Sequence, residues 1–130
     1  MSVREPRFLT LRQVERYHAR SLREHGGLEG VRDAGLLDSA LAAAQNAYYY
    51  GGGDLFEIAA AYAFHLAESQ AFLDGNKRTA TVAALAFLHI NGLAIRTSTE
   101  VLHDAMIAIA EKRLTKADLA EICRRLAASH

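Results

Sequence analysis

The sequence has little cysteine and no surplus of either charge, and both absences exclude classes of protein. Cys123 is the single cysteine, so the chain can form neither an internal disulfide nor a metal cluster held by several cysteines. Fifteen Lys and Arg residues balance fifteen Asp and Glu residues. Without a basic surplus, bulk binding of nucleic acid or of an anionic membrane is not expected, although a small local anion site is compatible with this balance.

Long hydrophobic runs are also absent. No uninterrupted apolar run approaches the roughly 20 residues that a helix needs to span a bilayer. Met1–Pro6 has no apolar core of the length found in signal peptides. We therefore expect a cytoplasmic protein without membrane contact, in which Cys123 is a buried, reduced thiol.

No repeat, linker or low-complexity tract divides the sequence. Its 130 residues are 51% hydrophobic and 23% charged, which is the ordinary mixture of a globular protein with a substantial core. We therefore expect one domain over residues 1–130.

Hydrophobic residues recur at helical spacing in about six segments, which predicts an all-α fold. Residues that can cap a helix precede most of these segments: Thr10, Asp33, Asp54, Ser98 or Thr99, and Thr115. Thr10 with Gln13 and Thr115 with Asp118 have the spacing of capping boxes. The connector Leu93–Arg96 has weak strand character.

Tyr48–Gly53 is predicted to be a loop, because three successive glycines cost too much backbone entropy for a helix interior. Its three tyrosines either pack half-buried against their own domain or dock a partner, and we favour the first reading.

Two segments, Leu55–Gln70 and Lys77–Ile90, are apolar almost all the way round, so each is expected to be buried on most sides. Together they predict a central helical hairpin whose tip is polar. At that tip, Asp74-Gly75-Asn76 is typical of a turn. The cations Lys77 and Arg78 then fall in the first turn of the next helix, where the helix dipole disfavours positive charge.

A bound anion would resolve this conflict at the tip, since free backbone N–H groups, the dipole and two cations all favour a phosphate. The plain alternative is an ordinary helix–helix connection in which Lys77 and Arg78 are solvated.

The stretch Phe72–Ala80 reads Phe-Leu-Asp-Gly-Asn-Lys-Arg-Thr-Ala and resembles the signature of the Fic/Doc (Fido) family. The Lys before the Arg, and the Thr-Ala after it, are similar to the death-on-curing toxin branch. The likeness continues along nearly the whole chain, at Gly26–Leu41, Asp54–Glu57 and Asn91–Gly92. It implies a Fic/Doc-like helical bundle around the central hairpin.

The resemblance also implies roles for the residues of the tip. Asp74 would hold Mg²⁺, whose preference for oxygen ligands suits a carboxylate. The phosphates of ATP, or of another nucleoside triphosphate, would be bound by Gly75, Asn76, Lys77 and Arg78. Phe72 would be an apolar anchor without a chemical role.

Gln70 is the main departure from the family pattern, because it stands where the family has its catalytic histidine. That histidine is the general base, and a glutamine amide can position a hydroxyl or a water without accepting its proton. Loss of a base typically slows a reaction by about 10²–10⁴-fold, which attenuates the activity. His65 points about 140° away from Gln70 on the same predicted helix, at about 100° per residue, so it is not expected to replace the base.

Three functions follow from the resemblance. The first is a toxin of a toxin–antitoxin pair that transfers phosphate to a hydroxyl of a cytosolic protein such as a translation factor. Its antitoxin would act in trans, because the chain lacks the family's Ser/Thr-x-x-x-Glu-Gly/Asn inhibitory pattern. The alternatives are an inactive relative that binds a nucleotide or a protein, and an adenylyltransferase. Thr81 favours phosphate transfer over AMP transfer, because many adenylylating members have a second arginine there. A purely structural, dimeric helical module is a further alternative without a bound anion.

Overall fold

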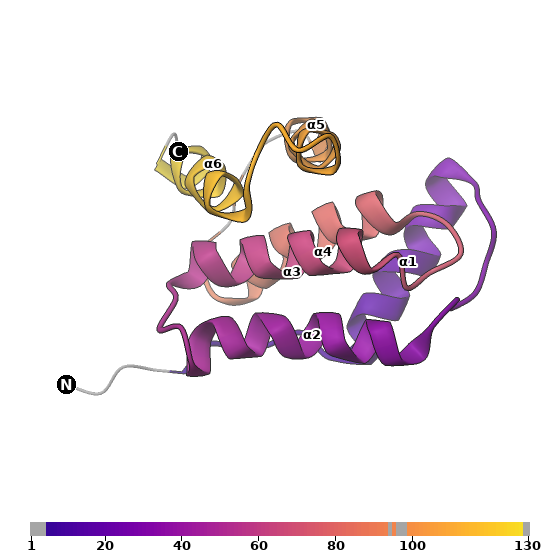
Figure 1. Ribbon diagram of the computed structural model, residues 1–130, viewed down its shortest axis with the longest axis horizontal. Coiled ribbons are helices and arrows are strands. Elements are labelled where there is room, and N and C mark those ends of the chain that lie inside the picture. The colour runs from indigo at the N-terminus through magenta and orange to yellow at the C-terminus, as the bar shows by residue number, and fades with distance from the viewer. Residues whose placement is uncertain (1–4, 94, 96–98, 129–130) are drawn as a thin grey trace.

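The computed structural model describes residues 5–93, 95 and 99–128 and shows an all-α fold, as predicted. Its helices are α1 (Leu11–His25), α2 (Ala34–Tyr49), α3 (Leu55–Ser69), α4 (Asn76–Ile90), α5 (Thr99–Ala110) and α6 (Lys116–Ala128) (Figure 1). Within the described residues the only β pairing is an isolated bridge between Val31 and Phe72. Of the predicted connector and cap, Ala94, Arg96 and Ser98 lie outside the described residues.

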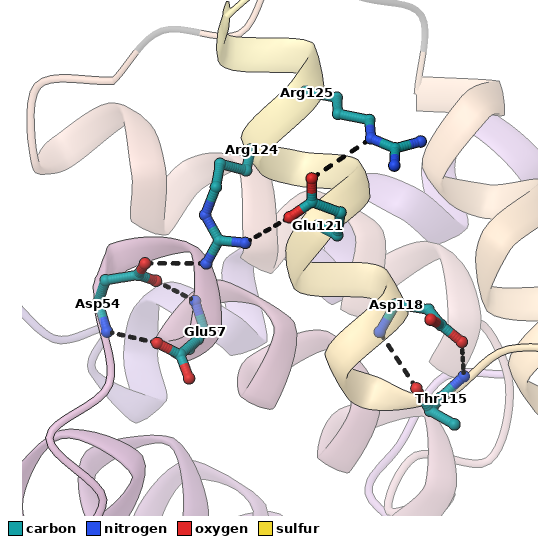
Figure 2. Close-up of polar contacts among 7 residues, drawn as sticks. All are labelled: Asp54, Glu57, Thr115, Asp118, Glu121, Arg124 and Arg125. Carbon is teal, nitrogen blue, oxygen red and sulfur yellow. Dashed lines mark hydrogen bonds and ion pairs between the residues drawn. The ribbon is translucent and has the colours of Figure 1, made fainter.

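Local hydrogen bonds fix where the helices begin. Thr10 and Gln13 form the predicted capping box at α1. Asp33 accepts the Leu36 N–H at 3.0 Å and caps α2. A capping box joins Asp54 with Glu57 at α3, and the predicted one joins Thr115 with Asp118 before α6 (Figure 2). These caps confirm predictions that depended only on neighbouring residues.

The prediction of a loop over Tyr48–Gly53 is wrong at its first two residues, because α2 continues through Tyr49. The ring of Phe8 lies 6.0 Å from the Tyr48 ring and 5.6 Å from the Tyr49 ring, and these contacts support the last helical turn. Tyr48 is half-buried, as favoured, whereas Tyr50 is 87% exposed. The helix therefore stops at the glycines and not at the tyrosines.

The α3–α4 hairpin is the centre of the molecule, as predicted. In Figure 1, α2 lies on one side of this pair and α5 and α6 lie on the other, while α1 packs against α4. Small side chains of both helices are buried, which permits the helices to approach closely: Ala59, Ala60, Ala61, Ala63, Ala80, Ala83 and Ala84. No helix among the described residues is both long enough and apolar enough to cross a membrane.

Burial in this core raises the pKa values of two residues, Tyr62 and Cys123. The Tyr62 hydroxyl accepts the Leu9 N–H at 2.9 Å, and burial raises the pKa of Tyr62 to about 12. Cys123 is fully buried, as predicted, and burial raises the pKa of its thiol to about 11. A thiol with such a pKa stays protonated at neutral pH and is unreactive.

Candidate functional site

The hairpin tip ends α3 and begins α4 with two residues in the left-handed region. Gln70 has φ 48° and Gly75 has φ 74°. Gly75 is the N-cap of α4 and supplies no side-chain hydrogen bond to it. The first N–H groups of a helix have no acceptor within the helix, so those of Asn76, Lys77 and Arg78 are directed at whatever lies in front of α4. This geometry suits an anion.

The connector between α1 and α2 fixes the tip from outside. Ala71 C=O accepts the backbone N–H groups of Arg32 at 2.7 Å and Asp33 at 3.1 Å, and the Leu73 N–H donates to Gly30 C=O at 3.1 Å. The backbone of the tip is therefore held by a segment about 40 residues earlier in the chain.

The Arg32 side chain donates hydrogen bonds to two carbonyls at the end of α3. Its Nε donates to the Gln70 carbonyl at 2.8 Å and its Nη2 donates to the Ser69 carbonyl at 3.1 Å. A cation at these carbonyls meets the negative end of the helix dipole, so it stabilises the turn at Gln70. No spacing in the sequence indicates this role for Arg32, since its partners are distant along the chain.

Asn76 locks the tip through its side chain. Its Oδ1 accepts the Phe72 N–H at 3.0 Å, and its Nδ2 donates to the Phe72 carbonyl at 3.0 Å. Its amide oxygen and one of its two amide N–H groups are thus committed to the loop. Phe72 is 2% exposed, which confirms its interpretation as an apolar anchor.

His18, on α1, supports the tip from a distant part of the sequence. Its ring stacks on Phe72 with centroids 3.8 Å apart and an interplanar angle of 9°. Its Nε2 donates to the Asp74 carbonyl at 2.8 Å. His18 therefore orients the turn that carries Asp74 and Gly75.

Asp74 lies where the loop after α1 passes close to the tip. Its Oδ2 accepts the Leu28 N–H at 3.1 Å. Gly27 has φ 124°, and a Cβ there would lie 3.2 Å from Asp74 Cβ and 2.9 Å from Leu22 Cδ2. A side chain at this position would displace the loop, so glycine permits the approach.

The donor set around Asp74 fits Mg²⁺ only together with an anion. No group of three His, Cys, Asp or Glu side chains within the described part of the chain is arranged to hold a metal. Mg²⁺ is usually bound by one or two carboxylates, with substrate phosphates and water as its other ligands. The exposed carboxylate of Asp74 would meet this requirement if a phosphate were bound at the start of α4.

A cavity of about 510 Å³ lies in front of α4. It is lined by every residue that the sequence analysis proposed for the site: Gln70, Asp74, Gly75, Asn76, Lys77 and Arg78. It is also lined by Ser21 and His25 of α1 and by His103 of α5, which the sequence analysis did not propose. His25 and His103 therefore bring imidazole rings to the cavity, whereas Gln70 has no such ring.

Arg78 is held between α1 and α5. Its Nη1 lies 3.4 Å from His25 Nε2 and 3.7 Å from a carboxylate oxygen of Glu100. A guanidinium can only donate, so His25 Nε2 is the acceptor of this contact. The Lys77 ammonium, by contrast, has no hydrogen-bond or ion-pair partner among the residues that the structure describes.

The surroundings of His103 favour the neutral form of its ring. Burial lowers its pKa below 6.5, and Arg78 lowers it further, while Glu100 and Asp104 oppose this shift in part. Its Nδ1 is buried and has no hydrogen-bond partner within the described residues. The amphipathic pattern of its helix gave no sign that this side chain reaches a cavity.

His65 does not belong to the site, in agreement with its predicted direction. Its Nε2 lies 3.2 Å from the Lys116 ammonium, so it faces α6. Burial, followed by the charge of Lys116, lowers the pKa of His65.

The helical bundle, the Gln70–Ala80 tip and its cavity define a class. The chain belongs to the Fic/DOC family, whose sequence model matches residues 8–88. Its relatives include Protein kinase doc of Escherichia phage P1, which is 34% identical over 110 residues, covering 84% of this chain and 86% of that protein. Toxin Doc of Mycolicibacterium smegmatis is 48% identical over 80 residues, covering 58% of this chain and 60% of that protein.

Proposed function

We propose that this chain is the toxin of a toxin–antitoxin pair and transfers a phosphate group from ATP to a hydroxyl of a cytosolic protein. The observation that carries the proposal is the uncapped start of α4, with Lys77, Arg78 and Asp74, on a cavity of about 510 Å³. The likeness to a relative named Protein kinase doc, over most of both chains, supports phosphate as the transferred group.

Each residue of the site has a different role in the proposed phosphate transfer. The N–H groups at the start of α4 hold oxygens of the transferred phosphate, and Arg78 binds two phosphate oxygens with its planar fork. Asp74 would hold Mg²⁺, which supplies positive charge to the phosphates during transfer. Lys77 adds a point charge at the mouth of the cavity.

Gln70 positions the attacking hydroxyl without taking its proton. The hydroxyl oxygen bonds to the γ-phosphorus as the bond to ADP breaks, and its proton passes to a phosphate oxygen or to water. Phosphoryl transfer depends chiefly on positioning and on stabilising charge, so the reaction can proceed without a strong base. We expect a rate about 10²–10⁴-fold below that of an enzyme with the histidine in place.

Thr81 supports phosphate transfer over AMP transfer. It is 2% exposed, and its hydroxyl donates to the Lys77 carbonyl at 3.0 Å. The position at which many adenylylating relatives have a second arginine is therefore buried and uncharged. This leaves Arg78 as the arginine of the motif that can bind phosphate.

The direct test incubates the protein with Mg²⁺, cytosolic extract and ATP labelled at either the γ- or the α-phosphate. Transfer of the γ label to a protein is the expected result, and Arg78→Ala should abolish it. Transfer of the α label instead would indicate an adenylyltransferase. If neither label reaches any protein at high enzyme concentration, the transferase proposal is wrong.

A partner antitoxin is part of the proposal. Co-expression with the gene product of the adjacent reading frame should yield a complex and relieve growth inhibition. Growth inhibition that no neighbouring product relieves would contradict the pairing.

A second candidate function is nucleotide binding without transfer, favoured by the amide at Gln70. In that case Mg²⁺ with ATP raises the melting temperature, while label transfer stays at background in both the wild type and Gln70→Ala.

A further inference from the structure

The candidate site adjoins a second cavity, of about 420 Å³, between α1, α4 and α5. The second cavity has a more apolar lining, to which Tyr17, Val82, Leu85 and Ile95 contribute. Four residues line both cavities: Ser21, His25, Arg78 and His103. A ligand that enters both cavities must pass between these four side chains.

The groups at this junction are arranged for an anion. The side chains of Arg78 and His25 face one another at 3.4 Å, although both can carry positive charge. An anion between them would accept hydrogen bonds from both and replace this weak contact with two charge-assisted ones. Ser21 adds a hydroxyl, which donates equally well to a phosphate oxygen.

A second, independent observation at the junction concerns His103. Its buried Nδ1 has no partner in the described structure, and such an atom costs free energy until it is hydrogen-bonded. If the ring turns toward the junction on binding, this nitrogen can donate a hydrogen bond to a phosphate oxygen, which removes the cost. The family match ends at residue 88, so His103 lies outside the matched segment.

The charges that face His103 come from every element packed around the junction. From α4 they are Lys77 and Arg78, which together with burial keep the ring neutral in the absence of a ligand. From α5 they are Glu100 and Asp104, which act in the opposite direction. From α1, the ionisable side chains of Arg20, Glu24 and His25 line the adjoining cavity. The two negative charges of a bound phosphate outweigh the positive charges of Lys77 and Arg78. A bound phosphate therefore favours the imidazolium form of His103.

We propose that Ser21, His25, Arg78 and His103 form a second phosphate subsite, which holds a further phosphate of a nucleoside di- or triphosphate and takes up a proton on binding. The inference rests on the proposed nucleotide-dependent function and assigns two histidines to it. The start of α4 binds one phosphate, the junction binds the next, and the apolar cavity beyond takes the nucleoside.

The sign of the pH dependence follows from linkage. Since the bound form carries more protons than the free form, affinity rises as the pH falls, by up to about tenfold per pH unit for each proton taken up. The nucleotide's own ionisation contributes equally in all variants, so it cancels when variants are compared. We expect wild-type affinity to rise between pH 8 and pH 6 by about three- to tenfold more than that of a variant without both histidines.

The test measures binding of Mg²⁺–ADP, a non-hydrolysable Mg²⁺–ATP analogue and AMP by isothermal titration calorimetry at pH 6, 7 and 8. The variants are His103→Gln, His25→Gln and the double variant. His65→Gln is the matched control, because His65 lies against α6 and lines neither cavity. Titration of the wild type in two buffers of different ionisation enthalpy gives proton uptake directly and does not depend on any variant folding.

For the di- and triphosphate, the pH dependence should be steep in the wild type and in His65→Gln and shallow in the double variant. AMP, with one phosphate, should show the same pH dependence in all five proteins. Equal pH dependence in the wild type and the folded double variant would overturn the subsite, as would zero proton uptake at every pH. Nucleotide binding with the expected pH dependence but without label transfer would support the subsite and overturn only the transferase proposal. Absence of any nucleotide binding would overturn both proposals.

Discussion

The side-chain amide of Asn76 pairs with both backbone polar groups of Phe72, at 3.0 Å each. One residue of the candidate site thereby maintains the shape of the loop that precedes it. In the proposed site, an anion is bound mainly by the backbone N–H groups and by the charged neighbours Lys77 and Arg78.

Asn76→Ala should destabilise the protein and weaken anion binding together. The substitution leaves the Phe72 N–H and carbonyl without partners, which costs about 1–3 kcal/mol for a buried group. Urea unfolding measures the loss. Lys77→Ala is the matched control on the same helical turn, and it should leave stability nearly unchanged while weakening binding of Mg²⁺–ATP. Equal stability of both variants would contradict the locking role of Asn76.

Gln70→His should raise the rate of label transfer. A histidine supplies the imidazole that a glutamine lacks, and a general base typically contributes about 10²–10⁴-fold. The φ of 48° at this position is tolerable for histidine, which is enriched in the left-handed region. Gln70→Asn preserves an amide and should leave the rate near that of the wild type. An unchanged rate in Gln70→His would show that proton removal does not limit transfer.

Arg32→Ala should loosen the end of α3. It removes two hydrogen bonds to the Ser69 and Gln70 carbonyls, and their loss at an exposed site should cost about 1 kcal/mol in the free energy of unfolding. Arg32→Lys retains the charge but not the planar fork, so it should recover only part of the loss. Amide hydrogen exchange at Ala71 and Phe72 locates the effect, and unchanged exchange there would refute it.

Asp54 links the start of α3 to α6, where its Oδ2 accepts Arg124 Nη2 at 2.9 Å (Figure 2). Partial burial raises the pKa of Asp54, but hydrogen bonds from the Glu57 N–H and Arg124 outweigh it, so the pKa lies below the ordinary 3.8. A carboxyl with a lowered pKa stabilises the fold above pH 3.8, and this contribution is lost as the pH falls through the folded-state pKa.

Two substitutions separate the cap from the ion pair at Asp54. Asp54→Ala loses the helix cap as well, at a cost of about 1 kcal/mol. Asp54→Asn keeps a cap and loses only the charge, so it should cost less at pH 7. The difference in unfolding free energy between the wild type and Asp54→Asn should disappear toward pH 2 in a urea series. A difference that stays constant from pH 7 to pH 2 would contradict the linkage.

Most of the fold was predictable because its signals are local. Helical periodicity and caps such as Thr10, Asp33 and Asp54 involve residues three or four positions apart, so they depend little on the rest of the fold. The boundary of α2 was missed because local glycine entropy predicted a loop, whereas ring contacts from Phe8 extend the helix through Tyr49.

The sequence by itself determined the six helices, the central hairpin and the composition of its tip, from Gln70 to Arg78. Only the tertiary structure decided which other residues share that site. His18 meets Asp74 across 56 positions, and His25 meets Arg78 across 53. Such pairs depend on how α1 crosses α4, which side-chain packing sets over the whole core and which no spacing along the chain encodes.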